Sequence, residues 1–143
     1  MNIILDTNVW VSSFLNPKGH PAKLKDLWLK DEFTVIISPF IIEEIRSILS
    51  SPRIKGKYLI KTSEIELFLE LLILKAITVF PTGRIKLCRD FRDNHILEAA
   101  LLGKAEYIVT RDDDLKRDTH LIEEMKSFNI DILSITQFLR YIS

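Results

Sequence analysis

Several features are scarce in this sequence, and each scarcity excludes a class of protein. The 143 residues include one cysteine, Cys88, so the chain has no internal disulfide framework and no cysteine-rich zinc site. Four glycines and five prolines are too few for a collagen-like or linker-rich chain. The most apolar window, residues 65–80, contains Glu66, Glu70 and Lys75, so we expect no membrane-spanning segment. The first residues lack a signal-peptide pattern, and a cytoplasmic protein is the expectation.

An excess of charge of one sign is also missing. Twenty Lys and Arg balance 20 Asp and Glu, which argues against a protein coated in positive charge for nonspecific nucleic-acid binding. A local basic rim remains compatible with this balance. Apolar residues make up 47% of the chain and charged residues 28%, as in globular proteins. The length predicts one domain spanning residues 1–143.

Short apolar runs rich in β-branched residues alternate with longer helical patterns. We expect strands at residues 3–5, 33–37, 76–80, 106–110 and 130–133. We expect helices at residues 22–30, 39–49, 63–74, 90–102 and 135–141, and loops at 55–57 and 81–83. Several strand candidates are apolar at consecutive positions, which is typical of strands covered on both faces of a parallel sheet. The alternation therefore predicts a layered α/β fold.

Local signals predict where some of these helices begin. Ser38 before Pro39 predicts an N-cap followed by proline in the first helical position. A capping-box pattern predicts that the next helix opens at Ser63. Asp90 is expected to cap the helix that Gly103 ends. The helix at 63–74 is apolar nearly all round, so we expect it to be buried deeply or covered by a second subunit of a homodimer.

Acidic and polar residues follow two of the expected strands. In open α/β sheets, sites form beyond the carboxyl ends of the strands. Asp6, Thr7 and Asn8 follow the first strand, and Thr110 precedes a run of three aspartates at residues 112–114. Taken singly, an aspartate after a strand is best interpreted as the cap of the next helix.

Two acids within helices are harder to explain as structural residues. Glu44 lies beside the apolar stripe of its helix, whereas Glu43 is expected to face solvent. Asp93 precedes Ile96 and Leu97 by three and four residues, which again indicates the inward face. The structural alternative is that both carboxylates bend toward water, with Asp93 also complementing the helix dipole.

A gathering of four such carboxylates needs compensation. At about 5 Å and an effective dielectric constant near 20, each pair repels by roughly 3 kcal/mol. Protonation, Lys or Arg partners, or divalent cations relieve this repulsion. Oxygen ligands suit Mg²⁺ or Mn²⁺, and acidic clusters that bind these ions are suited to the hydrolysis of phosphodiesters.

Four segments follow one another in order over almost the whole chain. They are Leu5-Asp6-Thr7-Asn8-Val9, Ser38-Pro39 leading to Glu43-Glu44-Ile45, Cys88-Arg89-Asp90 leading to Asp93-Asn94-His95-Ile96-Leu97-Glu98-Ala99-Ala100, and Val109-Thr110-Arg111-Asp112-Asp113-Asp114-Leu115. Together these segments resemble the PIN domain family, in particular its small prokaryotic members described as toxin components of toxin–antitoxin pairs.

The resemblance implies a three-layer α/β/α sandwich around a central parallel sheet of about five strands. It also implies a Mg²⁺- or Mn²⁺-dependent ribonuclease with an antitoxin protein as partner. The implied catalytic acids are Asp6, Glu44, Asp93 and Asp112, with Asp114 as a possible replacement for Asp112. By the same resemblance, Asp6, Asp93 and Asp112 hold the metal, Glu44 orients a water, and Thr7, Asn8 and Thr110 support them.

Basic residues offer two candidate contacts for an RNA backbone. The stretch that contains Arg89 and Arg92 is the better candidate, because it adjoins the proposed acids. A second group is read either as a solvated loop or as a track for RNA, namely Arg53, Lys55, Lys57 and Lys61. The remaining candidates are given structural interpretations. Trp10 and Trp28 are expected to pack in the core or in an interface, and His20, His95 and His120 are expected to be surface or loop residues.

Two other functions compete with the ribonuclease. A phosphatase with Asp6 as nucleophile would want a second aspartate two residues on, where the chain has Asn8, and a lysine placed to hold the phosphoryl group. A noncatalytic interaction module would use the acids to bind the arginines of a partner.

Overall fold

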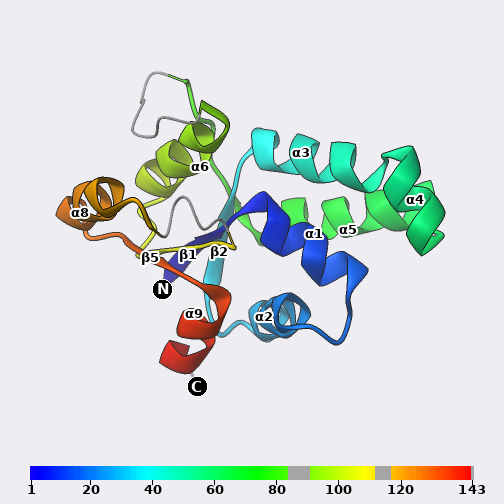
Figure 1. The fold of residues 1–143 in the computed structure, drawn as a ribbon, viewed down its shortest axis with the longest axis horizontal. Coiled ribbons are helices and arrows are strands. Elements are labelled where there is room, and N and C mark those ends of the chain that lie inside the picture. The colour runs from blue at the N-terminus through cyan, green and yellow to red at the C-terminus, as the bar shows by residue number, and fades with distance from the viewer. Residues whose placement is uncertain (84–90, 112–116, 143) are drawn as a thin grey trace.

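A computed structural model describes residues 1–83, 91–111 and 117–142, with the side chains of residues 91–93 excepted (Figure 1). Five strands form one parallel sheet in the order β3-β2-β1-β4-β5. The strands are β1 (Asn2–Leu5), β2 (Thr34–Ile37), β3 (Ile77–Thr78), β4 (Tyr107–Val109) and β5 (Asp131–Leu133). The central strand β1 pairs Ile4 with Ile36 on one side and with Ile108 on the other. All three side chains are fully buried, which explains the continuous apolar runs.

Helices cover both faces of this sheet, so the predicted three-layer α/β/α architecture is confirmed (Figure 1). Helices α6 and α8 lie on one side of the strands, and α2 and α9 lie on the other. The described helices are α1 (Thr7–Leu15), α2 (His20–Leu29), α3 (Pro39–Leu49), α4 (Pro52–Tyr58), α5 (Thr62–Lys75), α6 (Phe91–Leu102), α8 (Thr119–Ser127) and α9 (Ile135–Ile142). Among the described residues, none of these helices is both long enough and apolar enough to cross a membrane.

The predicted caps are partly confirmed. The Ser38 hydroxyl accepts a hydrogen bond from the Ile41 N–H at 3.2 Å, with Pro39 in the first helical position of α3. Helix α5 begins at Thr62, one residue before the predicted Ser63, and Glu64 accepts from the Lys61 N–H at 3.0 Å. Asp90 lies outside the described residues.

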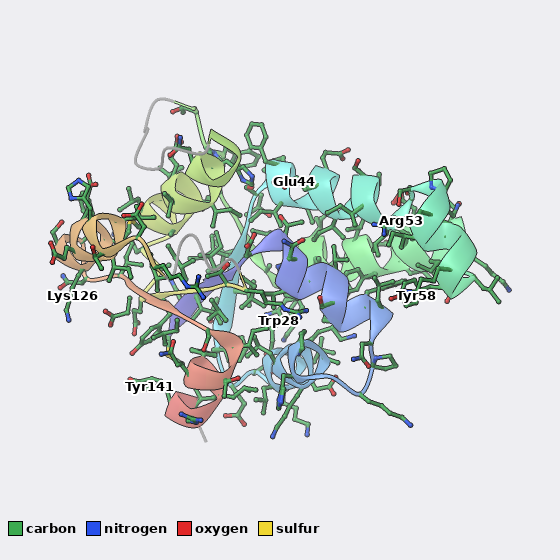
Figure 2. The ribbon with its side chains drawn as sticks, in the orientation of Figure 1. Trp28, Glu44, Arg53, Tyr58, Lys126 and Tyr141 are labelled. Carbon is green, nitrogen blue, oxygen red and sulfur yellow. The ribbon has the colours of Figure 1, made fainter. Side chains whose placement is uncertain are left out.

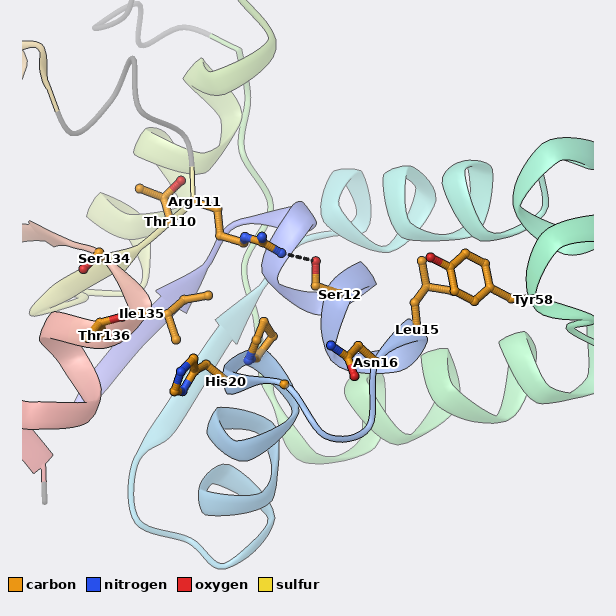
Figure 3. A pocket seen from close by; sticks show the side chains of 12 residues that line it. Ser12, Leu15, Asn16, His20, Tyr58, Thr110, Arg111, Ser134, Ile135 and Thr136 are labelled. Atoms are coloured by element: carbon orange, nitrogen blue, oxygen red, sulfur yellow. Dashed lines mark hydrogen bonds between the residues drawn. The ribbon is translucent and has the colours of Figure 1, made fainter.

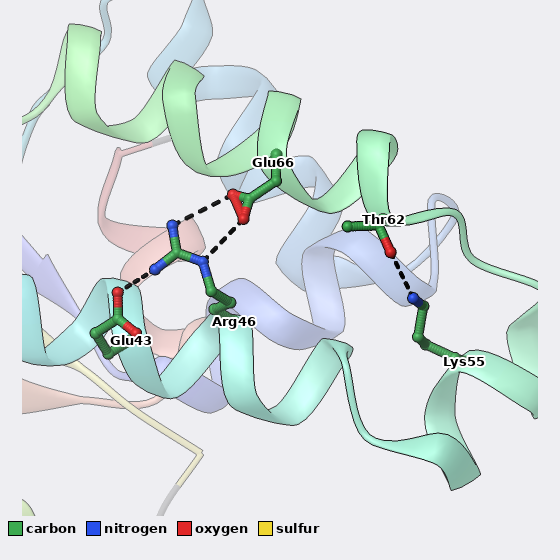
Figure 4. A network of polar contacts seen from close by, with 5 residues as sticks. All are labelled: Glu43, Arg46, Lys55, Thr62 and Glu66. Atoms are coloured by element: carbon green, nitrogen blue, oxygen red, sulfur yellow. Dashed lines mark hydrogen bonds and ion pairs between the residues drawn. The ribbon is translucent and has the colours of Figure 1, made fainter.

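The prediction of a loop at residues 55–57 is wrong, because these residues lie in α4. This helix is fastened to its successor by Lys55 Nζ, which donates to the Thr62 hydroxyl at 2.6 Å (Figure 4). Arg46 ties α3 to α5 in the same region. Its guanidinium lies between Glu43 and Glu66, and it donates to the two Glu66 oxygens at 3.0 and 3.2 Å. These contacts, that with Glu66 foremost, raise the pKa of Arg46 above its ordinary value.

Aromatic rings fill the core beside α1 and α2. Trp10 and Trp28 are buried and meet edge to face, with ring centroids 5.2 Å apart. Phe68 of α5 packs against Trp10 at 6.4 Å. The prediction that both tryptophans serve packing is therefore confirmed.

The close approach of α6 to the sheet depends on a glycine. A Cβ built on Gly103, just after α6, would lie 2.5 Å from Cδ1 and 2.8 Å from Cγ2 of the buried Ile36. Since real Cβ atoms do not approach so closely, Gly103 sets the distance between α6 and β2.

Candidate active site

Asp6 is the residue at the carboxyl end of the central strand. It ties β1 to β4, because its N–H donates to the Val109 carbonyl at 3.0 Å. Its own carbonyl accepts from the Val9 N–H at 3.0 Å, which begins α1. Asp6 therefore occupies the N-cap position of α1, yet its side chain makes no capping hydrogen bond. The interpretation of this carboxylate as a simple helix cap does not hold.

The Asp6 carboxylate is instead bound by a residue from the neighbouring strand end. The hydroxyl of Thr110, which follows β4, donates to Asp6 Oδ2 at 2.9 Å. Asp6 is 6% exposed, and Thr110 is fully buried. Burying a carboxylate costs several kcal/mol unless hydrogen bonds or cations compensate it. The pair brings together two of the residues predicted for the site.

The polar residues after Asp6 differ in their surroundings. Asn8 is exposed, whereas Thr7 is 3% exposed. The Thr7 hydroxyl is buried without a hydrogen-bond partner among the described residues. Native proteins leave few buried polar atoms unsatisfied, so this oxygen indicates a partner beyond the protein's own described atoms, such as water or an ion.

Glu44 lies near the start of α3, on the side that faces α6 (Figure 2). Its carboxylate contacts Nε2 of His95, and the ring of His95 lies 5.8 Å from that of Phe40. The His95 side chain is 17% exposed, so the prediction that it is a surface residue is wrong. Glu43 is exposed, as predicted, and contacts Arg46.

The contact between Glu44 and His95 helps to place the backbone of Asp93 relative to α3. The backbone of Asp93 lies in the first turn of α6, two residues before His95. This turn therefore starts beside the helix that carries Glu44. The side chains of Asp93 and Arg92 lie outside the described part, as do Arg89, Asp112 and Asp114 entirely.

The described residues contain no group of three or more His, Cys, Asp or Glu side chains placed to hold a metal ion. The side chains of most of the acids expected in the site are outside the described part of the structure. The donors that are described, the Asp6 and Glu44 carboxylates and the Thr7 hydroxyl, are oxygen atoms of the kind that Mg²⁺ and Mn²⁺ prefer. The type of ligand atom therefore suits such an ion.

Glu98 is a buried acid that the sequence interpretation missed. It is 2% exposed on α6 and accepts hydrogen bonds from the backbone N–H groups of Thr82 and Gly83, the latter at 3.0 Å. It thereby fastens the segment after β3 to α6. The available signal was a single charged residue within the otherwise apolar run from Ile96 to Leu102.

A groove of about 550 Å³ opens next to Thr110 (Figure 3). Its walls come from α1, from the starts of α2 and α9, and from the residues that follow β4. Arg111 crosses this groove, and its Nη1 donates to the Ser12 hydroxyl at 2.7 Å. The sequence interpretation did not identify this groove, because its walls come from segments far apart in the chain.

Comparison with known proteins shows what this chain resembles in sequence and in fold. A sequence model described as the PIN domain matches residues 2–114. The chain is 33% identical over 115 residues to the uncharacterized protein MJ1680 of Methanocaldococcus jannaschii, over 80% of this chain and 73% of that protein. Its fold is similar to a chain in the crystal structure of VapBC2 from Rickettsia felis bound to a DNA fragment from their promoter. That match has a TM-score of 0.59 and 15% identity, and it covers 94% of this chain and 98% of the other.

Proposed function

Because the chain belongs to the PIN domain family, whose members are generally nucleases, we propose that it is a Mg²⁺- or Mn²⁺-dependent endoribonuclease. The observation that carries the proposal is the buried Asp6 carboxylate, which accepts from Thr110 and does not cap α1. A carboxylate kept from solvent at the carboxyl edge of a parallel sheet is placed for binding a ligand.

Asp6, Asp93 and Asp112 would hold the metal, with Asp114 as the alternative to Asp112. A divalent cation in such a site supplies positive charge at the phosphate and lowers the pKa of an attacking water. The protein's own groups position the reactants. Thr110 fixes the orientation of the Asp6 carboxylate, and Glu44, held by His95, orients the water.

The hydrolysis breaks one phosphorus–oxygen bond of the RNA backbone. Water adds to phosphorus, the ester oxygen leaves, and the phosphate remains on one of the two products. Asn8 and Thr7 lie next to Asp6 and would support its carboxylate. Arg89 and Arg92 would contact the phosphates of the RNA, since a guanidinium matches two phosphate oxygens at once.

We further propose that the protein is a toxin with an antitoxin partner, acting in the cytoplasm. The structural neighbour from Rickettsia felis is a VapBC2 assembly, and the match to one of its chains covers nearly all of this chain.

A homodimer is supported by helix α5. One stripe of this helix, Leu67, Leu71 and Leu74, is exposed although apolar, with exposed fractions of 66%, 37% and 78%.

The proposal predicts cleavage of single-stranded RNA that depends on Mg²⁺ or Mn²⁺. Chelation by EDTA should abolish cleavage, and restoring the metal should recover it. Asp6→Asn and Asp93→Asn should each lower kcat/KM by more than about 100-fold, because each removes charge from the metal site. Gel analysis of labelled RNA measures both effects.

The matched control is Asp131→Asn, because Asp131 is an exposed carboxylate at the amino end of β5, the opposite edge of the sheet. It should cleave like the unmodified protein. Equal cleavage by all variants would contradict the proposal, and so would release of phosphate from small phosphomonoesters without RNA cleavage. Thermal unfolding of each variant checks that the fold is retained.

A further inference from the structure

The groove next to Thr110, described above, has no role in the proposed chemistry. It shares Thr110 with the acidic site, since this residue lines the groove and also donates to Asp6 (Figure 3). The groove therefore lies one hydrogen bond away from the Asp6 carboxylate. Its volume of about 550 Å³ lies within the roughly 300–1,000 Å³ of small-ligand sites.

The lining of the groove differs in charge from the acidic edge of the sheet. Besides Thr110, Arg111 and Tyr58, its polar groups are the hydroxyls of Ser12, Ser134 and Thr136, the Asn16 amide and the His20 ring. None of the described residues that line it is Asp or Glu. Hydroxyls and amides beside a guanidinium suit a ligand that carries negative charge and many hydrogen-bonding groups.

Arg111 is the cation at the end of the groove that adjoins the acidic site. Its hydrogen bond to Ser12 holds the guanidinium in place and uses one of the five N–H donors. Within the described part of the chain, Arg111 forms no ion pair with a carboxylate. An exposed guanidinium held in this way is ready to bind the two oxygens of a phosphate.

Tyr58 lies at the other end of the groove, where α4 ends (Figure 3). The residue is 42% exposed, and Nζ of Lys57 lies 5.4 Å from the centroid of its ring. Arg53 and Lys55 add positive charge on the same helix. An exposed aromatic ring among cations is the combination by which proteins bind single-stranded nucleic acids.

We infer that this groove holds the RNA next to the bond that is cut. One phosphate binds Arg111, and the strand continues toward Tyr58, on which a base stacks. The inference rests on the proposed nuclease function, because it assumes that the cut bond lies at Asp6. It assigns α4, read from sequence as a solvated loop or an RNA track, to the far end of the substrate site.

The test measures binding apart from cleavage. All variants carry Asp6→Asn, and the probe is a fluorescein-labelled oligouridylate of about 12 nucleotides followed by fluorescence anisotropy. Arg111→Ala should weaken binding roughly 10-fold or more and lower the slope of log K against log salt by about 0.7, the value for one phosphate contact on a single strand. Tyr58→Ala should weaken binding by roughly fivefold or more, whereas Tyr58→Phe keeps the ring and the affinity.

Lys126→Ala is the control, since Lys126 is an exposed cation on α8, away from the groove (Figure 2). The inference would be overturned if Arg111→Ala and Tyr58→Ala left the RNA affinity and the salt slope unchanged. That result is expected if a protein segment occupies the groove. The nuclease function is judged separately, by cleavage with Asp6 restored. If the protein with Asp6 restored cleaves RNA but the groove variants bind RNA normally, the groove is refuted and the nuclease function is not. If the groove variants lose RNA binding but the restored protein does not cleave RNA, the nuclease function is refuted and the groove stays an RNA-binding site without a cut bond.

Discussion

At the scale of the residue, one hydroxyl group, that of Thr110, links the acidic site to the groove. Thr110 is fully buried, donates to the Asp6 carboxylate and lines the groove that we assign to RNA. The methyl group of threonine fills space that serine would leave empty, and valine has the same shape without the hydroxyl. These two replacements separate the hydrogen bond from the packing.

Thr110→Val should lower kcat/KM for RNA by about 10- to 100-fold, because the Asp6 carboxylate loses the group that orients it. The free energy of unfolding should fall by about 1–3 kcal/mol, since a buried acceptor loses a donor. Thr110→Ser keeps the hydroxyl and should retain most of the activity. Cleavage by Thr110→Val at the unmodified rate would show that this hydrogen bond does not position the carboxylate.

Some residues of the site can be predicted from the sequence, and others cannot. Asp6 and Thr110 each follow a strand, and parallel strands bring their carboxyl ends to one edge. The pairing of Glu44 with His95 was not predictable, because it depends on how α3 and α6 pack. Asp93, Asp112 and Asp114 stay predictions.

At the scale of the element, the strands and helix α3 were predicted from the sequence, whereas helices α1, α4 and α8 were not. Helix α3 has the predicted bounds, because its buried residues recur at helical spacing. Helix α1 was not predicted, since its run of apolar and β-branched residues has no clear period. Helix α4 contains Gly56 and three basic residues, a composition more typical of loops.

Two glycines, one just after α6 and one within α4, give a matched test of packing. Gly103→Ala should lower the free energy of unfolding by about 1–3 kcal/mol, because the new methyl group meets the buried Ile36. Gly56→Ala in α4 should be neutral or stabilise by up to about 1 kcal/mol, since its Cβ meets nothing within 4 Å. Urea unfolding measures both, and equal effects of the two substitutions would contradict the role given to Gly103.

At the scale of the whole molecule, α5 has one stripe in the core and one at the surface. Ile65, Phe68 and Leu72 are buried, whereas Leu67 and Leu74 are exposed. Only four of the 14 residues of α5 are buried, so the first alternative, deep burial of this helix, is wrong. The second alternative, cover by a second subunit, stays a prediction. An apolar stripe in water favours association.

A dimer formed through this stripe should dissociate when charge is added to it. Leu67→Glu combined with Leu74→Glu should halve the molar mass from light scattering, because like charges would be buried at the interface. Phe128→Glu alters an exposed apolar residue after α8 and should leave the mass unchanged. A monomeric mass for the unmodified protein at micromolar concentration would contradict the dimer.

The central position of β1 makes the burial of Asp6 depend on a strand that is synthesised later in the chain. Its partner Thr110 is synthesised 104 residues after Asp6. At about 5–20 residues per second, this interval lasts roughly 5 to 20 s. Throughout this interval a nascent chain carries Asp6 without β4 and Thr110, the neighbours that complete the surroundings of its carboxylate.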